Sequence, residues 1–205
     1  MFNDKSILIT GGTGTLGQAC TKYILENYKP RRLVIFSRDE IKQNEMVQQF
    51  NDECLRFFIG DIRDQQRLNR AFNDVDYIIH AAALKHVNQA EYDPDEYIKT
   101  NVYGTQNVIN AAINNRVQKV ILISTDKSVN PISLYGASKL TAEKLFVAAN
   151  NLVGKRHTRF SVVRLGNIFG SRGSIIPLFK KMVADKNKTL PLTHINMTRF
   201  WIAPQ

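Results

Sequence analysis

The stretch that decides the fold is Lys5-Ser-Ile-Leu-Ile-Thr-Gly-Gly-Thr-Gly-Thr-Leu-Gly17, close to the start of the 205-residue chain. Its first part, Lys5–Thr10, is a short apolar run that is typical of a strand buried in a parallel sheet. Gly11, Gly14 and Gly17 follow at three-residue spacing, and a helical pattern begins there. Such glycines allow a tight turn, a close approach of the backbone to a diphosphate and close packing of helix on strand, while the helix N-terminus offers N–H groups to phosphates. The stretch therefore predicts a dinucleotide site, which also includes Thr13, Thr15 and Leu16.

The same alternation of strand and helix patterns continues along the chain. Helical patterns separate the apolar runs, and the longest of them are Pro94–Arg116 and Leu134–Ala149. This order is typical of an α/β fold, and we expect a Rossmann-like doubly wound parallel sheet of about six or seven strands. Residues 1–205 are expected to form one dinucleotide-binding domain that carries the catalytic residues, with 166–205 beginning a substrate-binding region. The further apolar runs that we assign to strands are Arg32–Phe36, Leu55–Ile59, Asp76–His80, Lys119–Ser124 and Thr158–Arg164.

The residues after the second strand indicate which dinucleotide binds. Enzymes that use NAD usually place an Asp or Glu there, about twenty residues past the last glycine, to accept from the ribose 2′-hydroxyl. This chain has Ser37 and Arg38 instead. A neutral hydroxyl next to a cation suits a 2′-phosphate, so we predict NADP. Asp39 and Lys42 belong to the same predicted site, and Lys42 could reach the phosphate, although both also fit a helix start that Asp39 caps.

Small residues follow the fourth strand. Ala81, Ala82 and Ala83 would let a flat ring and a diphosphate lie close to the backbone. Lys85 is predicted to meet phosphate or sugar oxygens of a substrate, with an ordinary surface lysine as the alternative. For His80 we favour a structural role, since it ends a buried strand without metal-ligand partners at usable spacing, and we expect no metal site.

Polar, reactive side chains crowd the exit of the fifth strand. Tyr135 and Lys139 stand four residues apart on a helical pattern, hence on one face of the helix. An ammonium beside a phenol favours the phenolate and lowers a pKa that is normally near 10. Such a tyrosine can exchange a proton with a sugar hydroxyl while a hydride leaves the same carbon. Tyr-x-x-x-Lys also arises by chance in helices, but here Thr125, Asp126 and Lys127 stand at a strand exit about ten residues earlier.

These motifs together resemble a known enzyme family. Ser-Thr-Asp-Lys at 124–127, followed by Asn-Pro-x-x-Leu-Tyr-Gly-Ala-Ser-Lys at 130–139, is similar to the extended short-chain dehydrogenase/reductase family and to its nucleotide-sugar 4,6-dehydratases. The pattern looks most like the inverting UDP-N-acetylglucosamine 4,6-dehydratases of pseudaminic acid synthesis, because Lys127 stands where the retaining enzymes carry a glutamate. Residues 164–174 and 196–203 are also similar to this family, although Leu165 replaces a more usual tyrosine. The resemblance implies a lyase that acts on a UDP-sugar with tightly bound NADP.

The resemblance also implies a reaction cycle. Tyr135, poised by Lys139 and Thr125, takes the proton of the C4 hydroxyl while a hydride passes to the cofactor. The 4-ketone acidifies the C5 proton, which Lys127 removes, and Asp126 protonates the departing C6 hydroxyl. The hydride then returns to C6 and a proton to the opposite face of C5. This cycle needs a lowered pKa for Lys127 and a raised pKa for Asp126.

Further contacts and a quaternary state follow from the same resemblance. Asp61 and Ile62 are expected to lie against the adenine, Ile168 is expected near the nicotinamide, and Asn101 is expected to order the active site. Related enzymes dimerise through the helices at 94–116 and 134–149, so we expect a homo-oligomer. Family members continue past the end of this chain, so we expect the substrate-binding region to be C-terminally truncated. Contacts to the substrate are expected from Lys85, Thr100, Asn167, Arg172 and Arg199.

The composition is ordinary for a soluble globular protein, with 43% apolar and 22% charged residues. No apolar run is long enough to span a bilayer and no signal-peptide segment is visible, so we expect a cytoplasmic protein without a membrane partner. Cys20 and Cys54 lack metal-ligand spacing and are expected to be core thiols. The formal net charge of +10 suits nucleotide ligands or an acidic remainder of a longer chain. No nucleic-acid-binding motif is visible, so nucleic acid is not an expected partner.

Two other functions fit part of the pattern. A C4 epimerase or a simple dehydrogenase on nucleotide sugars would share the fold and Tyr135, but epimerases of this type lack the acid and base that follow Thr125 here. A non-catalytic NADP-binding sensor or scaffold typically loses the tyrosine–lysine pair, which is intact in this chain.

Overall fold

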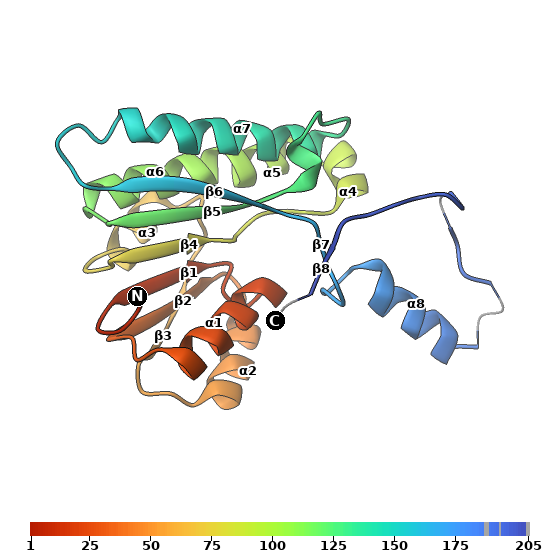
Figure 1. The fold of residues 1–205 in the computed structure, drawn as a ribbon, viewed down its shortest axis with the longest axis horizontal. Helices are drawn as coiled ribbons and strands as arrows, with labels where there is room; N and C mark the ends of the chain where they lie inside the picture. Colours follow the sequence, from red (N-terminus) through yellow and green to blue (C-terminus); the bar gives the residue numbers. More distant parts are fainter. Residues whose placement is uncertain (187–188, 193, 204–205) are drawn as a thin grey trace.

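Six parallel strands form the central sheet of the computed structural model, which describes residues 1–186, 189–192 and 194–203. The strands lie in the order β3-β2-β1-β4-β5-β6 (Figure 1), which confirms the predicted parallel α/β sheet. The direction of strand addition reverses between β1 and β4, and α/β sheets bind ligands outside the carboxyl ends of the strands at such a point. The strands are β1 (Ser6–Thr10), β2 (Arg32–Ser37), β3 (Leu55–Ile59), β4 (Tyr77–His80), β5 (Lys119–Thr125) and β6 (Arg159–Leu165).

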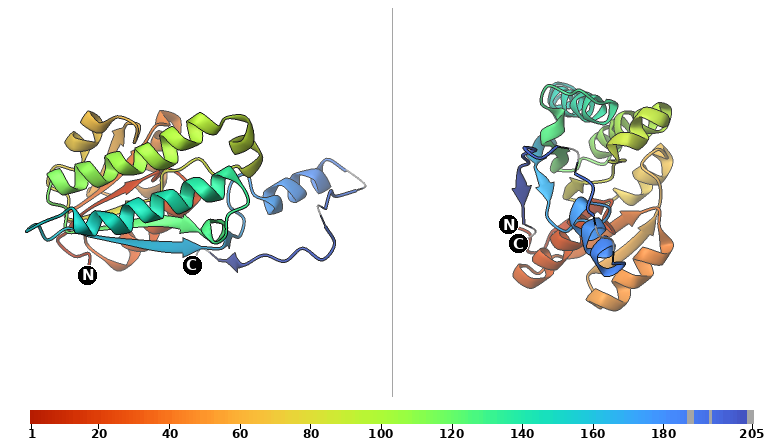
Figure 2. Two further views of the ribbon diagram at one scale, coloured as in Figure 1. Left: turned by 90° about the horizontal axis from the view of Figure 1, so that it is seen from above. Right: turned by 90° about the vertical axis from the view of Figure 1, so that its right-hand side faces the viewer.

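Helices cover both faces of the sheet (Figures 1 and 2). Because side chains alternate along a strand, Ile7 and Ile9 of β1 pack with Ile24 and Met46 of the first two helices, whereas Leu8 packs with the helices of the other face. Burial on both faces explains why the inner strands are continuous apolar runs. The helices α1 (Thr15–Asn27) and α2 (Glu40–Phe50) cover one face of the sheet. The helices α3 (Gln65–Ala71), α6 (Gly104–Asn114) and α7 (Leu134–Ala148) cover the other face. The short helices α4 (Val87–Tyr92) and α5 (Pro94–Tyr97) contact α7.

The long helical pattern predicted over Pro94–Arg116 contains a change of helix type. α5 passes into a π-helical segment, Ile98–Tyr103, before α6 begins at Gly104. The wider turn contains Asn101, which is only 1% exposed and forms hydrogen bonds with both the N–H and the carbonyl of Leu84, at 2.9 and 3.0 Å. The helical pattern is thus confirmed from Pro94 to Asn114, and the sequence did not predict the π-helical turn inside it. π-Helical turns are frequent at functional sites.

The C-terminal part of the described chain lies beyond the main sheet. β7 (Asn167–Ile168) and β8 (Trp201–Ile202) pair as a separate two-stranded parallel sheet. α8 (Ile175–Ala184) projects past the carboxyl edge of the main sheet (Figure 1), and none of the residues of this fully described helix is buried. Over the described ranges, every helix is too short or too polar to cross a membrane.

Candidate active site

The glycine turn between β1 and α1 has the geometry of a diphosphate cradle. Gly11 has a φ of +67°, and a Cβ on it would lie 2.8 Å from the Cα of Ala82 in the loop after β4. A Cβ on Gly17 would lie 2.4 Å from the carbonyl oxygen of Gly12, so only glycine allows α1 to approach the turn. Gly14 caps α1 without a side-chain hydrogen bond, which leaves the first N–H groups of the helix directed outward. The turn therefore fits a phosphate group held by backbone.

The exit of β2 differs in detail from the sequence-based prediction. Ser37 is buried, and its hydroxyl accepts a hydrogen bond of 3.0 Å from Nε2 of Gln43, a residue that sequence reasoning missed. Asp39 caps α2 by accepting from the N–H of Lys42 at 3.1 Å, and the two side chains form an ion pair. The alternative of a capped helix start is thus what the structure shows for these two residues. Arg38 keeps a half-exposed guanidinium that lies 3.5 Å from Asp61.

Asp61 and Ile62 follow β3, at the same edge of the sheet. The carboxylate of Asp61 accepts hydrogen bonds of 2.9, 2.9 and 2.7 Å from the backbone and guanidinium of Arg63. Burial acts to raise the pKa of Asp61, but these bonds and the charges of Arg63 and Arg38 outweigh it and lower the pKa. Ile62 is buried in the core against Gly104, so its side chain supports α6. The proposed contacts of both residues with adenine stay predictions.

Three segments that are distant in sequence meet beside the glycine turn. Lys85, after β4, donates from Nζ to the carbonyl of Arg172 at 2.8 Å, and the backbone N–H of Arg172 donates to the hydroxyl of Thr15 at 3.2 Å. Burial lowers the pKa of Lys85. Thr13 is buried in the turn itself. The structure thus brings the predicted substrate residues Lys85 and Arg172 to the start of α1.

Two other predicted substrate residues lie elsewhere. Thr100 is buried in the π-helical segment, and among the described residues its hydroxyl has no hydrogen-bond partner. Arg199 is exposed, and its guanidinium donates to the carbonyl of the neighbouring Thr198 at 2.7 Å.

The turn after β5 carries the residues that we predict to be the acid and the base. Thr125 ends the strand, and its hydroxyl donates to Oδ1 of Asp126 at 3.0 Å. Nζ of Lys127 donates to the same oxygen at 3.0 Å and to Oδ1 of Asn167 in β7 at 2.9 Å. Burial acts to raise the pKa of Asp126, but the bonds from Lys127 and Thr125 outweigh it and lower the pKa. The raised pKa that the reaction needs for this acid is therefore absent from this arrangement.

Tyr135 and Lys139 lie on one face of α7 and are both buried, at 8% and 4% exposed. Nζ of Lys139 donates to the carbonyl of Ile123 in β5 at 2.8 Å. Burial raises the pKa of Tyr135, and a hydrogen bond with Thr125 acts in the opposite direction. The expectation that Lys139 lowers the pKa of this phenol is wrong for this structure, because burial is the largest influence. Burial also lowers the pKa of Lys139 to about 8, against an opposite effect of Glu143.

Glu143 completes this face of α7, and sequence reasoning missed it. Its buried carboxylate lies 2.6 Å from the hydroxyl of Ser128, which closes the turn of Asp126 and Lys127. Arg164 of β6 donates to the same carboxylate at 3.1, 3.1 and 2.6 Å. The spacing of Tyr135, Lys139 and Glu143 by four residues each is the signal that could have identified it.

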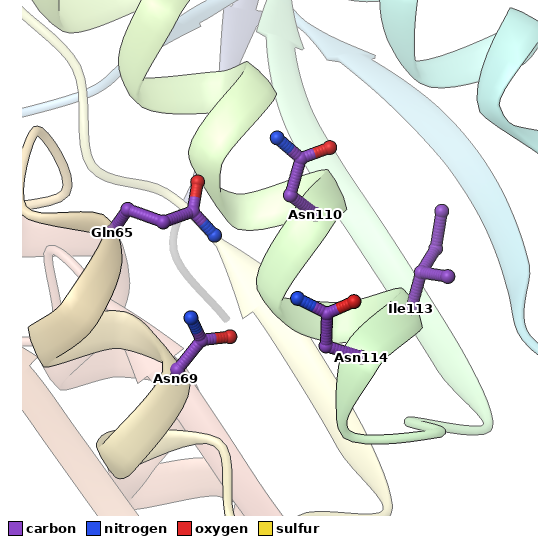
Figure 3. A pocket seen from close by; sticks show the side chains of 5 residues that line it. All are labelled: Gln65, Asn69, Asn110, Ile113 and Asn114. Atoms are coloured by element: carbon purple, nitrogen blue, oxygen red, sulfur yellow. The ribbon is translucent and has the colours of Figure 1, made fainter.

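Two hollows are formed by the described residues, and only one of them is lined by predicted site residues. An apolar groove of about 190 Å³ beside the glycine turn is lined by the predicted cofactor residues Leu16 and Ile168, together with Cys20 and Tyr23. A second, open depression of about 410 Å³ lies between α3 and α6 (Figure 3) and is lined mainly by amides. None of our predicted site residues lines the second hollow, so the groove is the one adjacent to the site. The amide-lined depression is formed by Gln65, Asn69, Asn110, Ile113 and Asn114.

The sheet order, the glycine turn and the buried tyrosine–lysine pair together define a Rossmann-type protein of the short-chain dehydrogenase/reductase class. Residues 7–204 match the family described as polysaccharide biosynthesis protein, and the chain belongs to this family.

Similar proteins include nucleotide-sugar enzymes. The chain is 60% identical over 203 residues, 99% of its length, to the UDP-N-acetylglucosamine 4,6-dehydratase (inverting) of Campylobacter jejuni subsp. jejuni serotype O:23/36 (strain 81-176). It spans about 61% of the length of that relative. It is also 46% identical over 203 residues, 98% of its length and 59% of the relative, to a UDP-glucose 4-epimerase of Rickettsia felis.

Solved structures share the fold. An X-ray structure of Pen from Bacillus thuringiensis matches with a TM-score of 0.95 and 43% identity, over 100% of this chain and 62% of the other. The dTDP-glucose 4,6-dehydratase DesIV from Streptomyces venezuelae, solved with NAD bound, matches with a TM-score of 0.85 and 27% identity, over 97% of this chain and 68% of the other.

Proposed function

We propose that this chain supplies the cofactor-binding and catalytic residues of an inverting UDP-N-acetylglucosamine 4,6-dehydratase, a lyase that uses NADP. The observation that carries the proposal is the turn after β5, where Asp126 and Lys127 share a hydrogen bond next to the buried Tyr135. The named relative from Campylobacter jejuni, 60% identical, supports the same reaction. The proposal includes a cytoplasmic homo-oligomer and a role in the synthesis of pseudaminic acid or a related surface sugar.

The residues around the glycine turn fit a nicotinamide dinucleotide. The cradle at Gly11 and Gly17 is a space that a Cβ would fill, and the uncapped start of α1 faces it. The bound cofactor would accept a hydride and later return it. Asp39 is engaged by Lys42, so it is not a free acceptor for a ribose 2′-hydroxyl, whereas Arg38 is half exposed and cationic. These two facts favour a 2′-phosphate and support NADP over NAD.

Tyr135 is the residue that would take the proton from the C4 hydroxyl of the sugar. Its phenol is buried, so a sugar hydroxyl placed there would meet a proton acceptor shielded from water. Burial raises the pKa of Tyr135. Burial lowers the pKa of Lys139 to about 8, which leaves its ammonium mostly protonated at pH 7 on the same face of α7.

Asp126 and Lys127 differ from the required acid and base by one proton. The structure holds an ion pair across 3.0 Å, whereas the reaction needs a carboxylic acid and a neutral amine. Transfer of the proton along that bond would supply both at once. In water the transfer costs about 9 kcal/mol, from normal pKa values of about 3.9 and 10.4. A substrate that covers the turn would remove water and favour the uncharged pair, because burial penalises charge.

The neutral pair then accounts for the elimination. Lys127 takes the C5 proton, and Asp126 gives its proton to the C6 hydroxyl, which leaves as water. A bound nicotinamide would supply the hydride that C6 gains, and a proton from solvent would add to the opposite face of C5. Asn167 holds Lys127 at 2.9 Å and so orients the base. Lys85 and Arg172 meet at the start of α1, and we propose that they contact the diphosphate or sugar of the substrate.

The homo-oligomer is proposed through the helices on the α7 face. Tyr103 and Val147 are 62% and 58% exposed there, which leaves apolar surface that a second copy would cover. Sedimentation velocity tests this part of the proposal, and a monomer at micromolar concentration would contradict it.

The reaction is tested by NMR of the sugar in D₂O. The protein is compared with a chimaera that continues with the remaining C-terminal residues of the Campylobacter relative, each incubated with UDP-N-acetylglucosamine and no added cofactor. We expect the chimaera to form a 4-keto-6-deoxy sugar with deuterium at an inverted C5. Unchanged sugar from a chimaera that retains bound NADP would contradict the proposal.

A C4 epimerase is the second candidate, because a relative of that name is 46% identical. The same NMR experiment distinguishes the two reactions. An epimerase would change the configuration at C4, keep the C6 hydroxyl and leave C5 without deuterium.

A further inference from the structure

His80, the last residue of β4, is a buried titratable group that the proposed reaction does not use. Its ring is 1% exposed and stacks on Phe146, with ring centroids 6.3 Å apart. Nδ1 lies 2.7 Å from the hydroxyl of Thr10 at the end of β1, and Nε2 lies 3.2 Å from the hydroxyl of Thr105 in α6. Both ring nitrogens are therefore engaged, each by a hydroxyl from a different element.

The direction of each hydrogen bond follows from counting protons. Thr105 donates its single hydroxyl proton to the carbonyl of Asn101 at 2.7 Å, so toward His80 it can only accept. Nε2 of His80 must then carry the ring proton, and Nδ1 must accept from the hydroxyl of Thr10. The hydroxyl oxygen of Thr10 in turn accepts from the backbone N–H of Ala82 at 3.3 Å. One directed chain thus runs from the backbone of Ala82 through His80 to the π-helical turn.

The two ends of this series of hydrogen bonds hold the same loop, Ala81–Leu84. At one end Ala82 bonds to Thr10, and at the other the amide of Asn101 bonds to the N–H and the carbonyl of Leu84. The loop also lies against the glycine turn, since a Cβ on Gly11 would be 2.8 Å from the Cα of Ala82. A small displacement of the loop would therefore change the shape of the diphosphate cradle.

We infer that His80 is a positioning residue of the dinucleotide site, which as the neutral Nε2–H tautomer between Thr10 and Thr105 fixes the loop Ala81–Leu84 against the glycine turn. The inference rests on the proposed dinucleotide site. Burial, with a smaller effect of Lys139, lowers the pKa of His80 to about 3, so the neutral ring persists at physiological pH. The ring acts on the cofactor through the loop and touches no reacting atom.

The first test measures binding of two ligands to variants of Thr105. Thr105→Val removes the acceptor of the Nε2 proton, and Thr105→Ser restores it. Thr141→Val is the matched control, because it removes an exposed threonine hydroxyl that bonds only within α7, to the carbonyl of Ala137 at 3.0 Å. Titration calorimetry gives the Kd of NADP and of 2′-AMP, which carries the adenine and the 2′-phosphate but has no phosphate for the cradle.

Thr105→Val is expected to weaken NADP about tenfold, as loss of one buried hydrogen bond would. The Kd of 2′-AMP is expected to stay unchanged, because that ligand would bind beside Arg38 and has no phosphate that enters the cradle. Thr105→Ser and Thr141→Val are expected to bind both ligands like the unmodified protein. Equal weakening of both ligands by Thr105→Val would overturn the inference, since it would indicate a general loss of structure, and so would an unchanged Kd for NADP.

The second test reads the tautomer without any ligand. Long-range ¹H–¹⁵N spectra of the unmodified protein at pH 6 and pH 8, with the ring signals assigned through His80→Gln, are expected to show the Nε2–H form at both values. An Nδ1–H form, or a change of protonation between them, would overturn the inference. If the tautomer is as expected and the unmodified protein binds no NADP, the proposed dinucleotide site fails, and the positioning role fails with it.

Discussion

Replacing Lys139 by methionine is expected to stabilise the fold, although it removes a residue that we place in the catalytic pair. Lys139 is 4% exposed, and burial lowers the pKa of its ammonium to about 8, against an opposite effect of Glu143. Relative to an unfolded-state pKa near 10.4, that shift is a penalty of about 3 kcal/mol at pH 7. Methionine loses the 2.8 Å bond to the carbonyl of Ile123, which costs roughly 1 kcal/mol. The expected net gain is about 2 kcal/mol.

The expected gain in the free energy of unfolding falls as the pH rises. Between the folded pKa of about 8 and the unfolded value near 10.4, the unfolded chain binds more protons at Lys139 than the folded chain does. The unmodified protein therefore becomes more stable as the pH rises through this window, because the buried group loses its charge. The methionine variant has no group that titrates at this position. Its gain in the free energy of unfolding over the unmodified protein is therefore expected to be full at pH 7 and to vanish by about pH 10.

Urea denaturation at pH 7 and pH 10 measures both effects. The matched control is Lys144→Met, an exposed lysine on the same helix, for which we expect a change within about 0.5 kcal/mol at either pH. The free energy of unfolding of Lys139→Met minus that of the unmodified protein is the quantity compared. A variant that is destabilised at pH 7, or a difference that is the same at both pH values, would refute the assignment of a desolvated ammonium at this position.

Three further predictions concern the cofactor and the base. Gly11→Ala is expected to abolish NADP binding in calorimetry, because the added Cβ would lie 2.8 Å from the Cα of Ala82. Gly154 also has a positive φ but has open space around it, so Gly154→Ala is the control and should bind NADP normally. Arg38→Met is expected to weaken NADP tenfold or more, as loss of a bond to a charged group does, and to leave NAD unchanged; equal loss for both dinucleotides would exclude contact with the 2′-phosphate. Lys127→Glu in the chimaera is expected to lose inverting turnover, and NMR that still showed an inverted C5 would sink its role as the base.

The sequence by itself determined the sheet, the glycine turn and the shared face of Tyr135 and Lys139. These features depend on neighbours in sequence, because burial on both faces gives continuous apolar strands and a helix returns to one face every three or four residues. The strand predicted at Leu55–Ile59 is the one observed, and the strands that end in Thr125 and Leu165 extend one residue past the predicted ends. The Asp39 cap was open to prediction for the same reason, since its partner Lys42 is three residues away.

Only the tertiary structure decided how the predicted groups are protonated and held. Burial acts to raise the pKa of Asp126, but the bonds from Lys127 and Thr125 outweigh it and lower the pKa, opposite to the prediction. Lys127 is itself held by Asn167, which is distant in sequence. The phenol of Tyr135 has a raised pKa because burial outweighs its hydrogen bond with Thr125. The π-helical turn likewise depends on bonds between Asn101 and the loop after β4. Desolvation and long-range hydrogen bonds are properties of the packed chain, and the local pattern of residues does not contain them.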